Sequence, residues 1–447
     1  MFDLSNFTPW VFFSDAGFIC ALLLIGKFLR VKVRLIQRMF IPPSLLAGLL
    51  GLAFGPNGLG WIPLSGNIST YAAILIAVVF GALPFSSPSF KVKEVARRVG
   101  PMWAFSQFGM LFQWAVMGLF GLLVLNLIWP DLNPAFGVML PTGFYGGHGT
   151  AAAIGSAFDN LGWDEAASLG MTTATIGVIV AILGGLLFVK IATKKGATSY
   201  ISDFNDLPDE YRSGLLPETK REPTAVGTTS PISIDSHMFH LALVIVAAFG
   251  GYLMSKGVKM LAPKFELPVF SCAFVVGILI KLAFNKAGAA RYIDPKTAVS
   301  ISGSATDLLV ACGVASIKLG VVVKYAVPLI VLLVVGIAVT IFTVFWFGRR
   351  LNRKDWFEKS IFAWGWWTGT MAMGIALLRI VDPKQQSKAM DDYALAYLPC
   401  APVEILLITF VPILFSSGNG LWLMLGCLVL SLLIIFLARR LGWWQKS

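Results

Sequence analysis

The chain has 447 residues, of which 57% are hydrophobic and only 13% are charged, and its formal net charge is +12. Such a hydrophobic chain is not intrinsically disordered, because disordered chains contain few apolar residues. A soluble nucleic-acid-binding protein is also excluded, because its basic residues would form a dense surface patch, whereas here they are scattered between long apolar runs. The composition predicts an all-α polytopic membrane protein.

Eleven apolar runs follow one another along the chain, most of them close to the roughly 20 residues that a membrane-spanning helix requires. They lie at 10–29, 41–56, 68–85, 100–129, 165–189, 237–262, 267–284, 300–322, 325–347, 392–415 and 420–438. The first ten residues contain no Lys or Arg. We therefore interpret the first run as a retained helix, since a cleaved secretory signal would begin with basic residues.

Two further segments, 134–158 and 360–380, are apolar but rich in glycine and interrupted by polar residues. Neither resembles a plain lipid-facing helix. Non-helical backbone is tolerated at membrane depth only where protein or a water-filled cavity surrounds it. We therefore expect both segments to be re-entrant hairpins.

The distribution of basic residues predicts the orientation of the chain. If the N-terminus is outside and the eleven runs cross alternately, most of the 35 basic residues fall on the inner side. Only five fall on the outer side, namely Lys256, Lys259, Lys264, Lys318 and Lys324. This bias matches the positive-inside rule. It predicts an outer N-terminus and a cytoplasmic C-terminus, and it requires that neither hairpin crosses the membrane.

The chain also shows an internal repeat. Pro43 in "IPPSLLAGLLG" parallels Pro268 in "ELPVFSCAFVVG", and Gly149-Thr150 parallels Gly369-Thr370. Each half has five spans and one hairpin, so the halves have opposite orientations, as in many secondary transporters. We expect an N-terminal repeat at 1–192, a cytoplasmic linker at 193–236, a C-terminal inverted repeat at 237–415, and an extra helix with a cytoplasmic tail at 416–447.

The strongest local motif is the glycine-rich run at 143–153, "GFYGGHGTAAA". A glycine-rich turn that leads into a helix exposes free backbone N–H groups and a partial positive charge, and both bind carboxylates. The alternative is a glycine-mediated helix contact in the membrane. In the binding interpretation, the candidate substrate-binding residues of this motif are Gly146, Gly147, His148, Gly149 and Thr150.

The mirrored motif "GWWTGTMAMG" places Thr368, Gly369 and Thr370 at the second hairpin, where they would bind the same small solute. Trp366 and Trp367 would line this site or lie at the membrane interface. Arg379 follows by a helical stretch, and it would either pair with a second substrate carboxylate or act as an inner topology anchor.

Acidic residues within apolar runs are expensive in a membrane and are therefore functional candidates. Glu404 and Asp307 are such residues, and with Tyr145 at the first hairpin they are our candidate cation ligands. The alternative is a carboxylate that is paired with a neighbour or lies near the interface. The five cysteines lie inside apolar runs without metal spacing, and the sequence lacks the P-loop pattern. No cofactor is expected, and the cation that these residues would hold is Na⁺ or H⁺; the family resemblance described next implies Na⁺ as the coupling ion.

"GGHGTAAA" at 146–153 and "FELPVF" at 265–270, together with the two halves, resemble the sodium/glutamate symporter family over about residues 10–415. The resemblance implies a multi-pass carrier of the bacterial inner membrane with inverted repeats and re-entrant loops. It also implies a homodimer with elevator-type alternating access. The implied activity is Na⁺-coupled symport of glutamate.

The residues leave two other functions open. One is a carrier of another small organic anion, for which coupling to H⁺ is an alternative to Na⁺. The other is an ion channel, although no repeated filter sequence is present. A membrane enzyme is not expected, because the chain lacks clustered His, Cys or carboxylate pairs.

Overall fold

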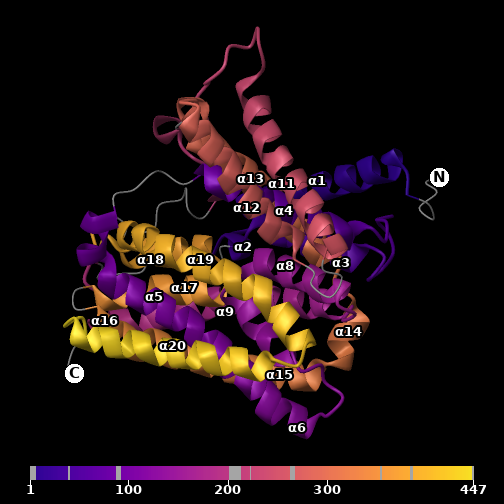
Figure 1. Ribbon diagram of the computed structural model, residues 1–447. Helices are drawn as coiled ribbons and strands as arrows, with labels where there is room; N and C mark the ends of the chain where they lie inside the picture. Colours follow the sequence, from indigo (N-terminus) through magenta and orange to yellow (C-terminus); the bar gives the residue numbers. More distant parts are fainter. Residues whose placement is uncertain are drawn as a thin grey trace. The chain divides into compact units, whose positions relative to one another are not determined.

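The computed structural model describes residues 7–38, 41–86, 92–200, 213–221, 223–261, 267–352, 355–382 and 386–444. These residues form helices and no strands, as Figure 1 shows. Within them, 10 helices are long and apolar enough to cross a membrane. The predicted class, an all-α polytopic membrane protein, is therefore confirmed. Much of the expected linker, at 201–212 and 222, lies outside the described residues.

The chain divides into two compact units, and each half of the sequence contributes to both. Unit 1 consists of Met1–Lys27, Pro43–Phe90 and Leu216–Ile317. Unit 2 consists of Phe28–Pro42, Lys91–Leu215 and Lys318–Ser447. The units therefore do not coincide with the two halves of the sequence, because each half supplies its early helices to unit 1 and its later helices to unit 2.

Unit 1 is a helical bundle built from three long or medium helices of each half. These are α1 (Pro9–Lys32, of which the last turn belongs to unit 2), α3 (Pro43–Phe54), α4 (Ile68–Ser86), α11 (Ser236–Leu261), α12 (Val269–Lys286) and α13 (Pro295–Ala315), with the short η3 (Glu218–Lys220) and η4 (Ala290–Tyr292). Helix α4 packs against α11, α12 and α13. Small and branched side chains such as Ala82, Ala247 and Ile301 fill the core between them, which allows close helix packing.

The second apolar run, 41–56, forms a shorter helix than we expected. Helix α3 has 12 residues, so it is about 18 Å long, whereas the hydrocarbon core is roughly 30 Å thick. The helix begins at Pro43, since proline favours a first helical position. It ends at Phe54, where the sequence Gly55-Pro56-Asn57-Gly58 forms a turn. Turn residues therefore limit a run whose apolar length alone suggested a full span.

Buried polar contacts in unit 1 connect the first helix of each half to the residues at the start of the third helix. On α1, the buried Asp15 carboxylate accepts hydrogen bonds from the backbone N–H of Ser65 (2.8 Å), the Ser65 hydroxyl and the Tyr71 hydroxyl (2.9 Å). On α11, the buried His240 Nε2 accepts a hydrogen bond from the backbone N–H of Asp294 (2.7 Å). The two halves thus use the same kind of contact at matching places.

We expect the substitution Asp294→Ala to lower the stability of unit 1 by about 1–2 kcal/mol, as for other helix N-caps. The Asp294 carboxylate caps α13 and accepts hydrogen bonds from the backbone N–H groups of Val226 (3.0 Å) and Thr297 (3.0 Å). Burial by itself raises the pKa of Asp294, but the hydrogen bond from the Thr297 hydroxyl (2.6 Å) and those from the backbone outweigh it, and the pKa is lowered. A lowered pKa means that the carboxylate stabilises the fold above its unfolded pKa, and that this contribution is lost as the pH falls through the folded pKa.

Thermal unfolding of the purified protein in detergent tests this expectation. The wild type and Asp294→Ala should differ at neutral pH and converge in acid. Asp294→Asn, which keeps a capping oxygen but does not titrate, should retain much of the stability at both pH values. An equal loss for Asp294→Ala at neutral and acid pH would contradict the assignment.

Unit 2 contains the remaining helices. Their bounds are α2 (Arg34–Arg38), α5 (Val92–Phe120), η1 (Gly121–Leu125), α6 (Asn126–Ile128), η2 (Phe136–Val138), α7 (Met139–Phe144), α8 (Gly147–Asn160), α9 (Ala166–Lys194), α14 (Leu319–Lys324), α15 (Ala326–Phe342), η5 (Thr343–Phe347), α16 (Gly348–Leu351), α17 (Trp356–Thr368), α18 (Met371–Val381), α19 (Ala389–Ser416) and α20 (Gly420–Arg440). Helix α5 packs against both α19 and α20, and α9 packs against α7, α8, α17 and α18. Helix α9 is thus in contact with each of the short helices α7, α8, α17 and α18.

Two of the long helices of unit 2 contain a π-helical segment near the C-terminal end. Segment η1 continues α5, and segment η5 continues α15 into α16. Gly121 in η1 approaches Gly137 so closely that a Cβ at Gly121 would lie 2.5 Å from the Gly137 Cα. π-Helical segments are rare, well under 1% of residues, and are frequent at functional sites. Their occurrence at corresponding places in the two halves is a second structural correspondence.

Candidate functional site

Two helical hairpins in unit 2 correspond to the two predicted hairpin segments. Hairpin 1 consists of α7, the residues Tyr145-Gly146 and α8, and hairpin 2 consists of α17, the residues Gly369-Thr370 and α18. The longest of these four helices has 14 residues, or about 21 Å. Each is therefore shorter than the roughly 30 Å that a complete crossing requires.

The turns of the hairpins follow from their residues. Gly147 has a φ angle of +63°, which glycine adopts readily and other residues adopt only at a cost. In hairpin 2, Thr370 has an extended backbone and is the N-cap of α18, where its hydroxyl accepts a hydrogen bond from the Met373 backbone N–H (3.4 Å). Thr370 therefore initiates the second helix as a capping residue.

The two tips are in contact with each other. A Cβ atom placed on Gly147 would lie 3.0 Å from the Gly369 carbonyl oxygen and 3.7 Å from the Thr370 Cγ2. Glycine at position 147 therefore lets the tip of hairpin 1 approach the backbone of hairpin 2 without the tight contact that a Cβ would make. Helices α8 and α18 both begin at this contact, so their N-termini lie close to it. The structure thus brings the turn of hairpin 1 at Gly147 to the turn of hairpin 2 at Gly369-Thr370.

Helix α9 supports both hairpins. The His148 Nε2 lies 3.2 Å from the Thr175 hydroxyl, and the Trp364 indole N–H donates to the Ala181 carbonyl oxygen (3.0 Å). At Gly177, an added Cβ would collide with the carbonyl oxygen of Thr368. The small residues of α9 therefore allow the backbone of hairpin 2 to rest directly on this helix.

The candidate side chains at the tips are buried and make defined hydrogen bonds. His148, Thr150 and Thr368 are each less than 5% exposed. The Thr368 hydroxyl donates to the Trp364 carbonyl oxygen (2.7 Å). The first backbone N–H groups of a helix have no partner within that helix. Two helix N-termini that begin at one contact can therefore offer N–H groups and partial positive charge to an anion.

A row of aromatic rings connects the tips to Glu404. The ring of Tyr145 lies 4.7 Å from that of Trp366 between ring centres, and Trp366 lies 4.3 Å from Tyr393. Tyr393 in turn contacts Tyr397 (5.7 Å), whose hydroxyl donates to the Glu404 carboxylate (2.8 Å). Of the candidate cation ligands, Tyr145 and Glu404 are therefore connected through this row of rings.

The other two predicted site residues are Asp307 and Arg379. Asp307 lies on α13, is exposed, and belongs to unit 1, whereas the tips belong to unit 2. Arg379 lies near the end of α18, nine residues after Thr370, which is about 13 Å further along the helix. This distance exceeds the reach of an arginine side chain, so Arg379 could contact only a substrate that extends from the tips along α18.

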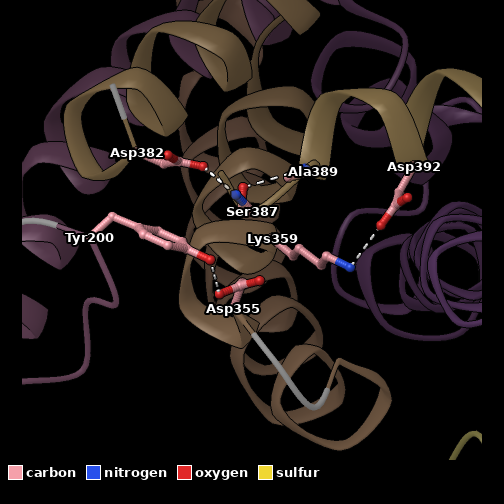
Figure 2. Close-up of polar contacts among 7 residues, drawn as sticks. All are labelled: Tyr200, Asp355, Lys359, Asp382, Ser387, Ala389 and Asp392. Carbon is pink, nitrogen blue, oxygen red and sulfur yellow. Dashed lines mark hydrogen bonds and ion pairs between the residues drawn. The ribbon is translucent and has the colours of Figure 1, made fainter. Parts of the chain in front are cut away.

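Polar contacts fasten the base of hairpin 2, and Figure 2 shows several of them. The Tyr200 hydroxyl donates to the Asp355 carboxylate (2.6 Å), and Lys359 forms an ion pair with Asp392 (3.0 Å). The carboxylate of Asp382 accepts from the Ser387 backbone N–H (2.7 Å). These contacts fix both ends of hairpin 2 to α19 and to the segment that follows α9. The base is therefore held by side chains, whereas the tip is held by backbone contact.

We expect Glu358→Ala to lower the stability of unit 2 by about 1–3 kcal/mol, because hydrogen bonds to a charged group contribute more than those between neutral groups. Glu358 is fully buried in the first turn of α17, and its carboxylate accepts from the Ser199 backbone N–H (2.6 Å) and hydroxyl (3.3 Å). Thermal unfolding in detergent measures the effect. Glu218→Ala is the control, because Glu218 forms only an exposed ion pair with Arg221. Equal midpoints for Glu358→Ala and the wild type would contradict the expectation.

The contacts of α9 with the hairpins, and of the α19 tyrosines with Glu404, were not predicted from the sequence. The run "MTTATIG" at 171–177 places Thr175 and Gly177 at the hairpins, and its small polar residues in an apolar helix were the available signal. Tyr393, Tyr397 and Glu404 are spaced by four and seven residues. This spacing places them on one face of α19.

Comparisons with known proteins point to one family. A family model described as "Sodium/glutamate symporter" matches residues 14–366. Two relatives named sodium/glutamate symporter, from Escherichia coli (strain K12) and Shigella flexneri, are each 25% identical to this chain over 358 residues. Each alignment covers 77% of this chain and 81% of the relative. Both relatives are named as symporters, which are transporters and not enzymes. The family match ends within α17, so α18, α19 and α20 lie beyond it.

Proposed function

Because the chain belongs to the sodium/glutamate symporter family, we propose that it is a secondary active transporter. It couples the movement of Na⁺ to the uptake of glutamate or a related anionic amino acid. The observation that carries this proposal is the contact between Gly147 and the Gly369 carbonyl oxygen, which brings two helix N-termini to one place in unit 2. A coupled carrier needs a site of this kind, where an anion meets donor groups in an apolar surrounding.

In the proposed mechanism, the substrate carboxylate accepts hydrogen bonds from backbone N–H groups at the start of α8 and α18. His148, Thr150, Thr368 and Thr370 shape this site from both hairpins. The pairing of Arg379 with a second carboxylate stays a prediction. Because an unneutralised carboxylate is costly within a membrane, a bound cation lowers the free energy of crossing for the anionic substrate.

We propose that Glu404 and Tyr145 contribute to the cation site. Glu404 lies within a span that contains Pro399 and Pro402. A proline has no N–H group, so each one leaves a carbonyl oxygen of the preceding turn without its helical partner. Carbonyl oxygens and carboxylates are the ligands that broken helices offer to Na⁺ in transporters. The same role for Asp307, which lies in unit 1, stays a prediction.

We further propose that the two halves are inverted five-helix repeats with re-entrant hairpins. Three matching pairs support this: Asp15 with His240, segment η1 with η5, and hairpin 1 with hairpin 2. Asp15 and His240 have the same separation in sequence as Pro43 and Pro268. In each half the same order of elements recurs, with three helices in unit 1 followed by a π-containing helix, a hairpin and a long helix in unit 2.

The division into units supports an elevator-type mechanism. Both hairpins and α9 belong to unit 2, and none of these elements belongs to unit 1. We propose that unit 2 carries the substrate while unit 1 stays fixed in the membrane. Spin labels on the exposed residues Leu59 of unit 1 and Leu161 of unit 2 should change their separation when Na⁺ and glutamate are added. An unchanged distance distribution would contradict this mechanism.

The resemblance also predicts a homodimer in the bacterial inner membrane, with an outer N-terminus and a cytoplasmic C-terminus. Mass measurement in detergent tests the dimer. Cysteine labelling from the two sides of the membrane tests the orientation.

Uptake of radiolabelled glutamate into proteoliposomes tests the proposed function. We expect accumulation with an inward Na⁺ gradient and none with an equal K⁺ gradient. Uptake of another organic anion but not of glutamate would change the assigned substrate. Uptake driven by a pH gradient without Na⁺ would change the assigned coupling ion to H⁺. Currents far above carrier turnover would favour an ion channel. No uptake with any anion or gradient would overturn the carrier assignment.

A further inference from the structure

The ends of two long helices of unit 2 form a cluster of arginine and tryptophan side chains. Trp346 and Arg350 come from the end of the helix formed by α15, η5 and α16, and Arg439 and Trp444 come from the end of α20 and the residues after it. We call these four residues the Arg–Trp cluster. The rings of Trp346 and Trp444 lie 5.7 Å apart between centres, and Figure 1 shows α16 beside the C-terminal end of α20. Arg349 and Arg440 flank the cluster.

The cluster is held in place by α5. The neighbouring Trp443 packs on Gly100 so closely that a Cβ at Gly100 would collide with the indole ring. Phe347 also contacts Trp444, at 5.8 Å between ring centres. The residues after α20 are therefore packed against two other helices of unit 2. This packing brings together arginines that are about 90 residues apart in the sequence.

The guanidinium groups stack on indole rings. The Arg350 guanidinium carbon lies 3.7 Å from the centre of Trp346 and 5.9 Å from that of Trp444, and the Arg439 guanidinium carbon lies 4.8 Å from Trp444. Stacking uses the face of the guanidinium and leaves most of its in-plane N–H donors available. Arg350 uses one N–H for the Trp346 carbonyl oxygen (3.3 Å). In the part of the chain that the structure describes, no carboxylate forms an ion pair with either arginine.

The surroundings of the cluster fit a lipid. Phe342 stacks on Trp346 at 5.3 Å and is 50% exposed, and Phe436 on α20 is 53% exposed. Both precede the arginines within apolar spans, so an exposed apolar surface continues from the cluster toward the middle of the membrane. A phospholipid has matching parts, since an anionic phosphate accepts bidentate hydrogen bonds from arginine and its acyl chains cover exposed apolar side chains.

We propose that the Arg–Trp cluster binds the phosphate group of an anionic phospholipid of the surrounding membrane. The acyl chains of this lipid lie along Phe342 and Phe436. Basic residues at the ends of spans also act as simple topology anchors, but an anchor requires neither indole stacking nor convergence of two helices on one place. The site is separate from the hairpin tips, so its test does not depend on the transported substrate.

The test measures the binding of phosphatidylglycerol and of zwitterionic phosphatidylcholine to the purified full-length protein in detergent by native mass spectrometry. We expect the wild type to retain phosphatidylglycerol preferentially. The double variant Arg350→Gln/Arg439→Gln should bind it about tenfold less tightly, because each basic residue near the surface contributes to anionic lipid attraction. The control Lys286→Gln/Arg291→Gln removes the same charge from exposed residues of unit 1 and should bind phosphatidylglycerol as the wild type does.

Two further measurements keep the proposal falsifiable. Arg350→Lys/Arg439→Lys keeps the charge but loses the planar, stacked donors, so its affinity for phosphatidylglycerol should be intermediate. This variant provides a test even if the glutamine variant fails to fold. Inorganic phosphate in excess at constant ionic strength should not displace the lipid. Equal retention of both lipids by the wild type, unchanged binding by the glutamine variant, or displacement by inorganic phosphate would each overturn the proposal.

Discussion

Gly147→Ala is expected to reduce glutamate uptake at least about tenfold, since a loss of 1.4 kcal/mol already corresponds to this factor. The new Cβ would lie 3.0 Å from the Gly369 carbonyl oxygen. Alanine is also strained at the φ angle of +63° that Gly147 adopts, because its Cβ approaches the backbone in the left-handed region. Neither tip has a flexible side chain at this contact that could move instead. The tips would therefore shift apart, and the two helix N-termini would lose the alignment that the proposed anion site requires.

Gly196→Ala is a matched control for this prediction. Gly196 has the same φ angle of +63°, but a Cβ placed there meets no atom within 4 Å. This variant carries the cost of the backbone conformation without the collision. Uptake assays in proteoliposomes should show near wild-type transport for Gly196→Ala and a large loss for Gly147→Ala. Similar activities of the two variants would mean that contact between the tips is not needed for transport.

Glu404→Gln is expected to raise the Na⁺ concentration for half-maximal uptake about tenfold or more, because the substitution removes the negative charge nearest to the proposed cation site. The glutamine side chain keeps the size of the residue and an oxygen that can accept from the Tyr397 hydroxyl, which now donates to Glu404 at 2.8 Å. A purely structural role would therefore leave the Na⁺ dependence unchanged. The measurement is initial uptake as a function of Na⁺ concentration at saturating glutamate.

Two variants help to interpret this result. Tyr397→Phe leaves the carboxylate in place and should shift the Na⁺ dependence less than Glu404→Gln does. Because the two side chains are in contact, their effects should not be additive in the double variant. Asp307→Asn tests the second predicted carboxylate, which lies in unit 1. A shift in Asp307→Asn without one in Glu404→Gln would assign the cation site to Asp307 instead.

Much of the fold follows from the sequence, because apolar length and glycine-rich interruptions are local properties. The spans and the two hairpin segments could be predicted, since both tips carry a Gly-Thr pair, Gly149-Thr150 and Gly369-Thr370, that precedes or begins a helix. The contact of Gly147 with Gly369 could not, because it depends on packing between the tips. The short helix α3 was less accessible, because its length depends on the turn at Gly55–Gly58 and not on the length of the apolar run. The division into units was not accessible either, since it depends on long-range packing such as that of α4 on α12 and α13.

The positions of the candidate site residues in the fold could be predicted only in part for the same reason. Residues near the tips in sequence are near them in space, as His148 and Thr368 show. Arg379 is also close in sequence, but a helix separates residues by about 1.5 Å each, and nine residues carry it away from the tip. Helix α9 contributes Gly177 and Thr175 from another part of the chain, which no local motif reveals. Glu404 was recognised because a carboxylate in an apolar span is unusual, whereas its aromatic neighbours are common in membrane helices.

Equilibrium binding of glutamate to the purified protein is the most direct test of the central claim, that the two hairpin tips form one Na⁺-dependent anion site. Calorimetry should detect glutamate binding in Na⁺ and not in an equal concentration of K⁺, and Gly147→Ala should lose this binding while Gly196→Ala keeps it. Binding that is equally strong in K⁺, or that survives in Gly147→Ala with unchanged affinity, would contradict the account.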